Sequence, residues 1–363
     1  MATNKNQHFV PKCYLKAFST ENTGLAINLF NIDHARFIVN APLKHQCSGD
    51  YFYGEDLRLE RAFQTLEGGY STLLKEILKP GYVLTDEHRS FLLEFWLIQH
   101  LRTEAASMRA VEMAEKISIE AGIDAQEYRL GIKEAVQHSM EIAIDQLPAV
   151  QDMKICLLRN RTSEPFVTSD DPAISTNLWY LESEKTKGDS FGVGAAGAIF
   201  LLPLTPNILC VAYDGDVYSI PHNNGWVDTK RKLDVQALNQ HQFLNCNANV
   251  YTHDKEYSES IRVQYEKVRH LRPLAKHLVH YAVFAGSKGG SSEFRVIDRS
   301  KAPEHDRALI HFQSVRPKPS AWPAVIRRRN NGAVFTNGTG LGYVRRLYCD
   351  ANRNQGFRKV RPW

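Results

Sequence analysis

Three polar residues stand out because they interrupt or end apolar stretches of the chain. Gln99 and Arg102 lie three positions apart in a run rich in Phe, Leu and Trp, so at least one of them is expected to be buried. A buried guanidinium needs a partner, because an unpaired buried charge costs several kcal/mol. Asp170, which ends an apolar run just before Pro172, is the predicted partner. Such a pair would either tie a helix to a sheet or anchor a phosphate or another substrate group.

Three further residues have side chains that suit a catalytic or metal centre. His8 would act as a general base, since imidazole titrates near neutrality, or it would only fix the N-terminus by hydrogen bonds. Glu60 and Glu67 lie seven positions apart and share one face of a predicted helix. Carboxylates can hold Mg²⁺ or Mn²⁺, and Glu67 with Asp170 is the predicted metal pair. The alternative for the glutamates is a solvated helix face.

Six short motifs follow one another along the first two-thirds of the chain. They are His8-Phe9-Val10-Pro11 with Tyr14-Leu15 and Phe18, Tyr51-Phe52-Tyr53 with Glu60 and Glu67, Gln99 with Arg102-Thr103, Thr168-Ser169-Asp170 with Pro172, Leu202 to Pro206, and Leu238-Asn239. Together, over roughly residues 4 to 255, they resemble a bacterial family catalogued as domain of unknown function 4238. The resemblance implies a shared fold and site position but no known activity. Gln99, Arg102 and Asn239 are the predicted substrate-binding residues.

Positive charge is concentrated at the C-terminal end. The whole chain has a formal net charge of +5, and residues 315–363 hold eleven Lys or Arg and a single acid. Such a segment attracts phosphate backbones or acidic surfaces, and arginines mixed with aromatic rings suit single-stranded nucleic acid. The alternatives are a solvated tail or a small β-unit docked on the body. The predicted nucleic-acid-binding residues are Arg327, Arg328, Arg329, Arg345 and Arg346.

Composition is typical of a folded globular protein. Hydrophobic residues make up 43% of the chain and charged residues 23%, which excludes wholesale disorder. No apolar run approaches the roughly 20 residues that cross a bilayer, and the first residues lack the apolar core of a secretory signal. The six cysteines include no Cys-x-x-Cys pair. We therefore expect reduced thiols in a cytoplasmic protein that has no membrane contact.

The elements that must position these residues are expected to form an α+β body, with a mixed sheet around a central buried helix. Residues 24–40 are typical of a β-hairpin, and 56–78 of a helix. The very apolar central helix is predicted to begin after Thr85, which would cap it. The remaining pattern predicts helices over 107–146 (broken near Gly122), 233–245 and 258–279, and strands over 153–158, 165–169, 198–204, 208–213 and 248–252.

A domain boundary is predicted near residue 287. Residues 287–292, Ser-Lys-Gly-Gly-Ser-Ser, have the composition of a flexible linker. We therefore expect a core domain over 1–286, followed by the linker and a small, basic, aromatic-rich appendage over 287–363.

Two functions of different class fit these patterns. The first is a nucleic-acid-directed hydrolase, a metal-assisted nuclease used in phage defence or as a toxin, with His8, Glu67 and Asp170 as its catalytic centre. The second is a non-catalytic RNA- or DNA-binding protein that binds through the basic tail, while the other polar residues only hold the fold.

Overall fold

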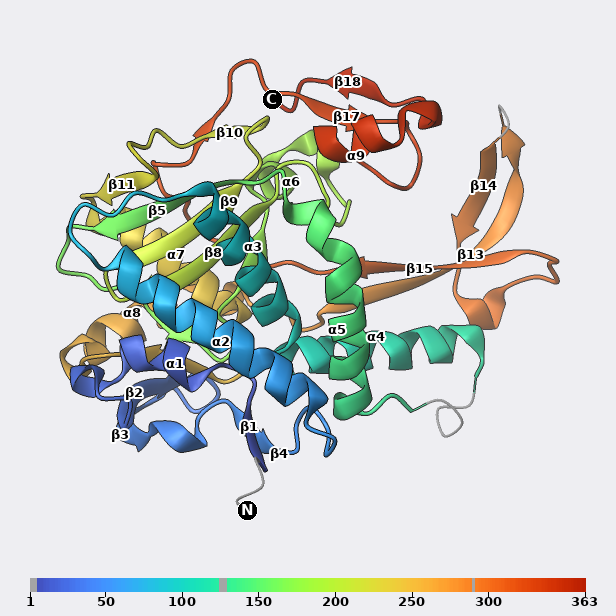
Figure 1. The fold of residues 1–363 in the computed structure, drawn as a ribbon. Helices are drawn as coiled ribbons and strands as arrows, with labels where there is room; N and C mark the ends of the chain where they lie inside the picture. The colour runs from blue at the N-terminus through green and yellow to red at the C-terminus, as the bar shows by residue number, and fades with distance from the viewer. Residues whose placement is uncertain (1–4, 124–128, 289–290) are drawn as a thin grey trace.

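The computed structural model describes residues 5–123, 129–288 and 291–363. Its architecture is α+β, as predicted, and a five-stranded sheet lies at its centre (Figure 1). The strand order is β11-β5-β9-β8-β7, in which β11 and β5 are parallel and all other neighbours are antiparallel, so the sheet is mixed. The strands are β5 (Lys154–Asn160), β7 (Ile174–Thr176), β8 (Ile199–Thr205), β9 (Ile208–Tyr213) and β11 (Trp226–Thr229).

A second, four-stranded sheet of order β3-β2-β12-β6 is antiparallel throughout. The predicted hairpin over 24–40 is confirmed as β2 and β3. Because β6 pairs with β12, the end of β6 lies beside the chain that leads into β12, and this places Asp170 there. The strands are β2 (Ala26–Asn31), β3 (Arg36–Pro42), β6 (Thr168–Ser169) and β12 (Asn249–Thr252), and a separate pair joins β1 (Asn6–His8) to β4 (Ser48–Asp50).

The central helix is α3 (Asp86–Leu101), and it is buried as predicted. The Thr85 hydroxyl accepts a hydrogen bond from the backbone amide of His88, which caps the helix. Trp96 of α3 stacks on Phe200 of β8 with ring centroids 3.8 Å apart. Packed against α3 are α2 (Arg58–Ile77), α4 (Glu104–Ala121) and α5 (Ile132–Gln146), and α1 (Lys12–Leu15) packs against α2.

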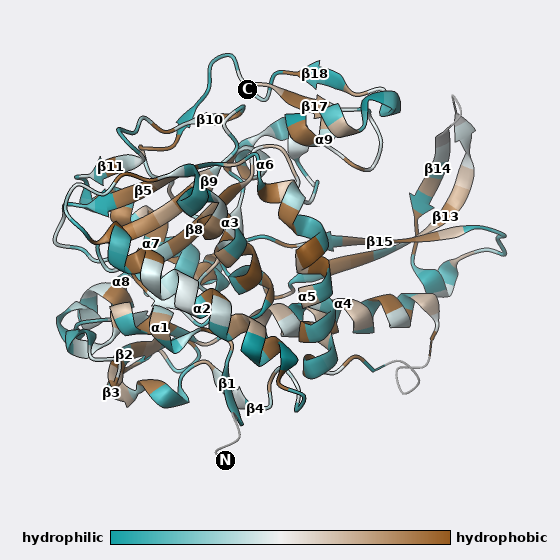
Figure 2. Cartoon of the chain, viewed as in Figure 1, coloured by the Kyte–Doolittle hydropathy of each residue, from teal (hydrophilic) through white to brown (hydrophobic). Residues whose placement is uncertain are grey.

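Hydropathy follows this layering, since Figure 2 shows strongly hydrophobic residues along β8 and β9 at the centre of the molecule. Within the described part of the chain, no helix is long and apolar enough to cross a membrane.

The helix predicted over 258–279 is wrong in its second half. Helix α8 (Ser258–Val268) ends early, and strand β13 (His277–Lys288) begins before residue 279. Pro273 lies between them, where its ring and missing amide would oppose a continuing helix. The other helices after the central strands are α6 (Leu178–Glu182) and α7 (Lys232–Asn245).

Strand β13, β14 (Ser291–Val296) and β15 (Ala308–Ser314) form a three-stranded sheet that projects from the body (Figure 1). In the linker predicted over 287–292, residues 287–288 end β13 and residues 291–292 begin β14, so Ser287 lies opposite Ser292 in paired strands. Residues 289–290 of that prediction lie outside the described residues. The boundary placed between residues 286 and 287 therefore falls within β13.

The remaining C-terminal residues pack against the body. Strand β16 (Arg327–Arg328) pairs with β10 (Tyr218–Ser219), and β17 (Val334–Thr336) pairs with β18 (Arg358–Val360), next to helix α9 (Arg346–Ala351). Val334 and Trp179 belong to one buried apolar cluster. The indole of Trp179 donates a hydrogen bond of 2.7 Å to the Pro362 carbonyl. Of the alternatives for the basic tail, the structure shows a β-unit docked on the body.

Candidate functional site

Arg102 lies just after α3 and is fully buried, as the apolar run around it predicts. Its predicted partner is wrong, because the guanidinium pairs with Glu67 of α2 at 2.9 Å and not with Asp170. It also donates to the Tyr53 hydroxyl at 2.9 Å and to the His8 carbonyl at 2.8 Å. Burial lowers the pKa of Arg102, but Tyr53 and Glu67 more than offset this, so the pKa is raised and the guanidinium stays charged.

The aromatic surroundings of Arg102 complete this environment. Its guanidinium carbon lies 4.0 Å from the ring centroid of Phe63, a cation–π contact. Gln99, one turn earlier, donates to the Phe9 carbonyl at 2.9 Å. The motifs around residues 8, 53, 67 and 99–102 therefore meet in one network, which we call the Arg102 network. Its side-chain contacts tie α2, α3 and the N-terminal strand together.

His8 contributes its backbone carbonyl to the Arg102 network. Its ring is buried, and the Nε2 atom has no hydrogen-bond partner among the described residues. Burial, with a smaller effect from the charge of Lys12, lowers the pKa of His8 to about 4, so the imidazole is neutral at pH 7.

Asp170 belongs to a different network at the end of β6. Its carboxylate accepts three backbone hydrogen bonds, from the amides of Asn247, Ala248 and Asn249, at 2.7–2.8 Å. Burial raises the pKa of Asp170 to about 6, against the opposing effect of these amides. The carboxylate closes the turn between α7 and β12, which is a structural role.

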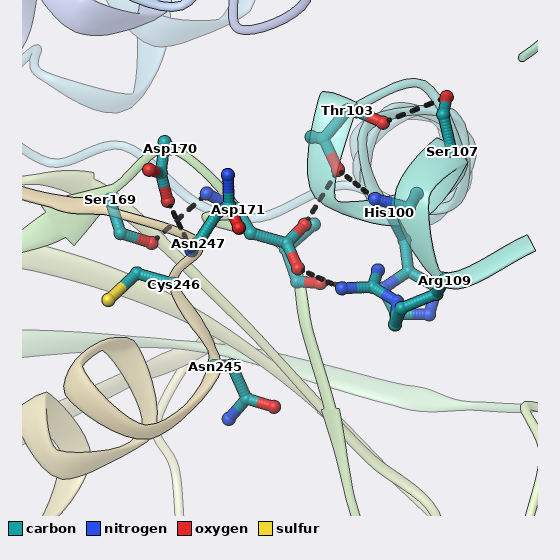
Figure 3. Close-up of polar contacts among 12 residues, drawn as sticks. His100, Thr103, Ser107, Arg109, Ser169, Asp170, Asp171, Asn245, Cys246 and Asn247 are labelled. Atoms are coloured by element: carbon teal, nitrogen blue, oxygen red, sulfur yellow. Dashed lines mark hydrogen bonds and ion pairs between the residues drawn. The ribbon is translucent and has the colours of Figure 1, made fainter. Parts of the chain in front are cut away.

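Asp171, next to Asp170, contacts the residue that follows Arg102 and the first turns of α4 (Figure 3). Its carboxylate accepts a hydrogen bond of 2.8 Å from the Thr103 hydroxyl and pairs with Arg109 of α4 at 2.5 Å. The same Thr103 hydroxyl accepts from the Ala106 amide and so caps α4. Thr103 follows Arg102 in the sequence, and Asp171 follows Asp170. The hydrogen bond between Thr103 and Asp171 therefore places the two networks next to each other, with no side-chain contact between Arg102 and Asp170. The expected single pocket of His8, Arg102 and Asp170 side chains is therefore absent among the described residues.

Asn239 of α7 is buried and holds the segment that leads into β6. Its side-chain oxygen accepts from the Val167 amide at 3.1 Å, and its side-chain nitrogen donates to the Pro165 carbonyl at 2.9 Å. The Ser169 hydroxyl similarly donates to Gln242 at 2.6 Å. These contacts satisfy the side chain of Asn239 internally, and its predicted role in substrate binding stays a prediction.

The carboxylates predicted to bind Mg²⁺ or Mn²⁺ have different partners: Glu67 contacts Arg102, and Asp170 contacts backbone amides. Burial and the charge of Glu67 raise the pKa of Glu60, so these two glutamates are electrostatic neighbours, as their spacing predicts. Across residues 5–123, 129–288 and 291–363, no group of three or more His, Cys, Asp or Glu side chains is arranged to hold a metal ion.

The five arginines predicted to bind nucleic acid have different environments. Arg345 is buried: it pairs with Asp152 at 3.0 Å and donates to the carbonyls of Ala149, Val193 and Ala195, so its assignment to a binding surface is wrong. It anchors the C-terminal segment to the body. The other four are exposed, although Arg329 bonds the Gly215 carbonyl and Arg346 pairs with Asp216 at 2.9 Å.

Sequence reasoning missed Thr103 and Arg109 as partners of Asp171. The Thr-Glu start of α4 is a recognisable cap signal. Nothing in the spacing of Arg109, however, points to an acid 62 positions away.

Comparison with known proteins agrees with this arrangement of motifs. Residues 6–256 match the family described as "Protein of unknown function (DUF4238)". No curated protein and no solved structure gives a significant match. The match spans the β1 strand, the Arg102 network and the Asp170 turn, and it ends before β13. On this match, which covers more than half of its residues, the chain belongs to the DUF4238 family.

Proposed function

We propose that this protein binds the phosphate backbone of single-stranded nucleic acid without cleaving it. The binding region would be a patch that we call the basic face, which consists of Arg327, Arg328, Arg358, Lys359 and Arg361. All five side chains are exposed, and none forms an ion pair with another described residue. This unneutralised charge is the observation that supports the proposal, because cations already paired with acids gain less from a phosphate.

These residues belong to two separate C-terminal strands and to the segment that follows the second of them. Arg327 and Arg328 form β16, whereas Arg358 and Lys359 belong to β18. The guanidinium carbon of Arg328 lies 4.1 Å from the ring centroid of Trp363, three residues beyond β18. An aromatic ring among exposed arginines is typical of surfaces that follow a single strand, since bases stack while guanidinium groups bind phosphate.

The hydrolase predicted from His8, Glu67 and Asp170 has weaker support. Each of these residues has its own internal contact: His8 through its carbonyl with Arg102, Glu67 with the same guanidinium, and Asp170 with three amides. Binding therefore takes precedence over hydrolysis in the proposal.

The test is fluorescence anisotropy of a labelled single strand over a series of salt concentrations. The variant Arg327→Gln, Arg328→Gln, Arg358→Gln, Lys359→Gln should bind much more weakly than wild type. Its slope of log affinity against log salt should fall by about 3, since each lost phosphate contact on a single strand removes roughly 0.7. The matched control is Arg61→Gln, Lys75→Gln, Lys133→Gln, Lys230→Gln, which removes the same charge from exposed positions on the body.

Equal loss in both variants would show that only net charge matters and would contradict the proposal. The strand should also stay intact after incubation with Mg²⁺ or Mn²⁺. Cleavage that Asp170→Asn abolishes, in a variant shown to be folded, would favour the hydrolase instead.

A further inference from the structure

A second group of cations lies at the junction of α4 with the base of the projecting sheet. Arg109 of α4, Lys276, His277 at the start of β13, and Arg316 beyond β15 line a hollow of about 190 Å³, which we call the basic hollow. Arg109 and Lys276 also line an adjoining hollow of about 440 Å³ on α4. Arg109 belongs to the region that matches the family, whereas Lys276 and Arg316 lie beyond it.

The cations of the basic hollow outnumber the acids that face them. Asp171 pairs with Arg109, but neither Lys276 nor Arg316 forms a side-chain ion pair or hydrogen bond with any described residue. The Nε atom of Arg316 is shielded from solvent without a partner, and so is the Nδ1 atom of His277. Arg316 has only a distant aromatic contact, with its guanidinium carbon 5.8 Å from the ring centroid of Phe191. Buried donors are normally satisfied, so this arrangement lacks an acceptor.

The electrostatics of the basic hollow agree with this geometry. Burial and the nearby charge of Arg109 lower the pKa of Arg316 to about 10. Burial, together with the charges of Arg272 and Arg109, lowers the pKa of Lys276. Arg316 therefore remains charged at pH 7, and the lowered pKa of Lys276 reflects repulsion by the neighbouring arginines. A bound anion would relieve both the repulsion and the unsatisfied donors.

The adjoining hollow suggests what the anion is attached to. Its wall is partly apolar, with Met108 and Leu274, and it carries the amide side chains of Asn245 and Asn247. Two acids, Glu112 and Glu115, and the cation Arg272 also line it, and Glu112 is paired with Lys116. We infer that the basic hollow and the adjoining hollow together bind a small organic phosphate, with its phosphate group on Arg109, Lys276 and Arg316. The organic part would then lie along the apolar and amide-bearing wall. This site is separate from the basic face, because it includes none of that face's residues.

The test uses calorimetric titration and thermal unfolding of the full chain with inorganic phosphate and adenosine monophosphate. Sodium chloride at equal ionic strength is the reference. Both phosphates should raise the Tm of wild type. Adenosine monophosphate should bind at least tenfold more tightly than inorganic phosphate, because only it fills the adjoining hollow. Equal affinities would overturn the assignment of the organic part.

Arg316→Gln is the informative variant, because the replaced side chain makes no hydrogen bond within the described residues. It should keep or raise the Tm in chloride while weakening phosphate binding at least tenfold. Lys267→Gln, an exposed position on α8, makes the same charge change and should bind as wild type. No phosphate-specific effect in wild type, or an equal effect in Arg316→Gln and wild type, would overturn the site. The quadruple variant of the basic face should retain phosphate binding, so this site can fail while the nucleic-acid proposal stands, or the reverse.

Discussion

Arg102 and Arg316 both have guanidinium nitrogens shielded from solvent, but their surroundings are opposite. Arg102 has an acid, a hydroxyl, a carbonyl and an aromatic face within contact distance. Arg316 has a distant ring and a neighbouring cation. Arg102 keeps one unpartnered nitrogen, Nη1, but its charge is balanced by Glu67, whereas Arg316 has neither an acid nor a hydrogen-bond acceptor among the described residues. On this contrast we interpret the family's polar motifs as structural, and we propose a binding role only for the cations of the C-terminal region.

Breaking the Arg102 network should have the largest effect on stability. Arg102→Met removes an ion pair and two further hydrogen bonds and leaves Glu67 without its partner, so the free energy of unfolding should fall by about 3–5 kcal/mol. Urea denaturation followed by circular dichroism measures it. Arg58→Met, at the start of the helix that carries Glu67, is the control, since that side chain is largely exposed and its pair with Asp56 should contribute under about 1 kcal/mol. Equal losses would show that Arg102 is not a structural centre.

The C-terminal segment contains a buried and an exposed arginine side by side, Arg345 and Arg346, which allow the same comparison. Arg345→Met leaves Asp152 and three carbonyls without their donor, and we expect a loss of about 3 kcal/mol. The neighbouring Arg346→Met breaks an exposed pair with Asp216 and should cost less than about 1 kcal/mol. Limited proteolysis should cut the segment after residue 315 faster in the first variant only. Similar cutting in both would remove Arg345 as the anchor.

Acid should destabilise the protein through its buried histidines. Burial lowers the pKa of His241 to about 4 from its ordinary 6.5, so its contribution to stability is complete above pH 6.5 and is lost as the pH falls towards 4. Between pH 7 and pH 5 this loss amounts to about 2 kcal/mol. Asp170 works in the opposite direction below its raised pKa of about 6, since protonation then favours the folded state.

His241→Phe isolates the histidine from these other groups. The ring Nε2 has no partner among the described residues, so phenylalanine loses no hydrogen bond there. The variant should lose about 2 kcal/mol less stability than wild type between pH 7 and pH 5, as measured by urea unfolding at each pH. Parallel pH profiles would show that His241 does not titrate on unfolding.

The smallest expected effect concerns Trp363 on the basic face. Trp363→Leu removes the cation–π contact with Arg328 and should cost about 0.5–1 kcal/mol of stability. If bases stack on this ring, single-strand affinity should fall by a further ~1–3 kcal/mol in the anisotropy assay. Affinity unchanged from wild type would restrict the basic face to phosphate contacts.

Local patterns predicted most of the fold. The cap at Thr85 and the apolar run after it located α3, and the β-rich runs around residues 31–36 located the first hairpin. One prediction failed because composition does not reveal strand pairing: residues 287–288 and 291–292 of the predicted linker belong to β13 and β14, which pair with each other.

Burial of Arg102 could be predicted from its neighbours in the sequence, but its partner could not. The sequence pattern pointed to Asp170, and only the packing of α2 against α3 brings Glu67 to the guanidinium. For Arg345 the burial itself could not be predicted. A basic, aromatic-rich segment gives no sign that one of its arginines faces inward.

The most direct test of the division between structure and binding compares two variants by two readouts. Arg102→Met and the quadruple variant of the basic face are each measured for single-strand affinity, under conditions where both are folded, and for their urea midpoints. We predict that Arg102→Met keeps the affinity of wild type but unfolds at lower urea, while the quadruple variant loses affinity and keeps its midpoint. Loss of affinity in Arg102→Met, with unchanged affinity in the quadruple variant, would contradict the account.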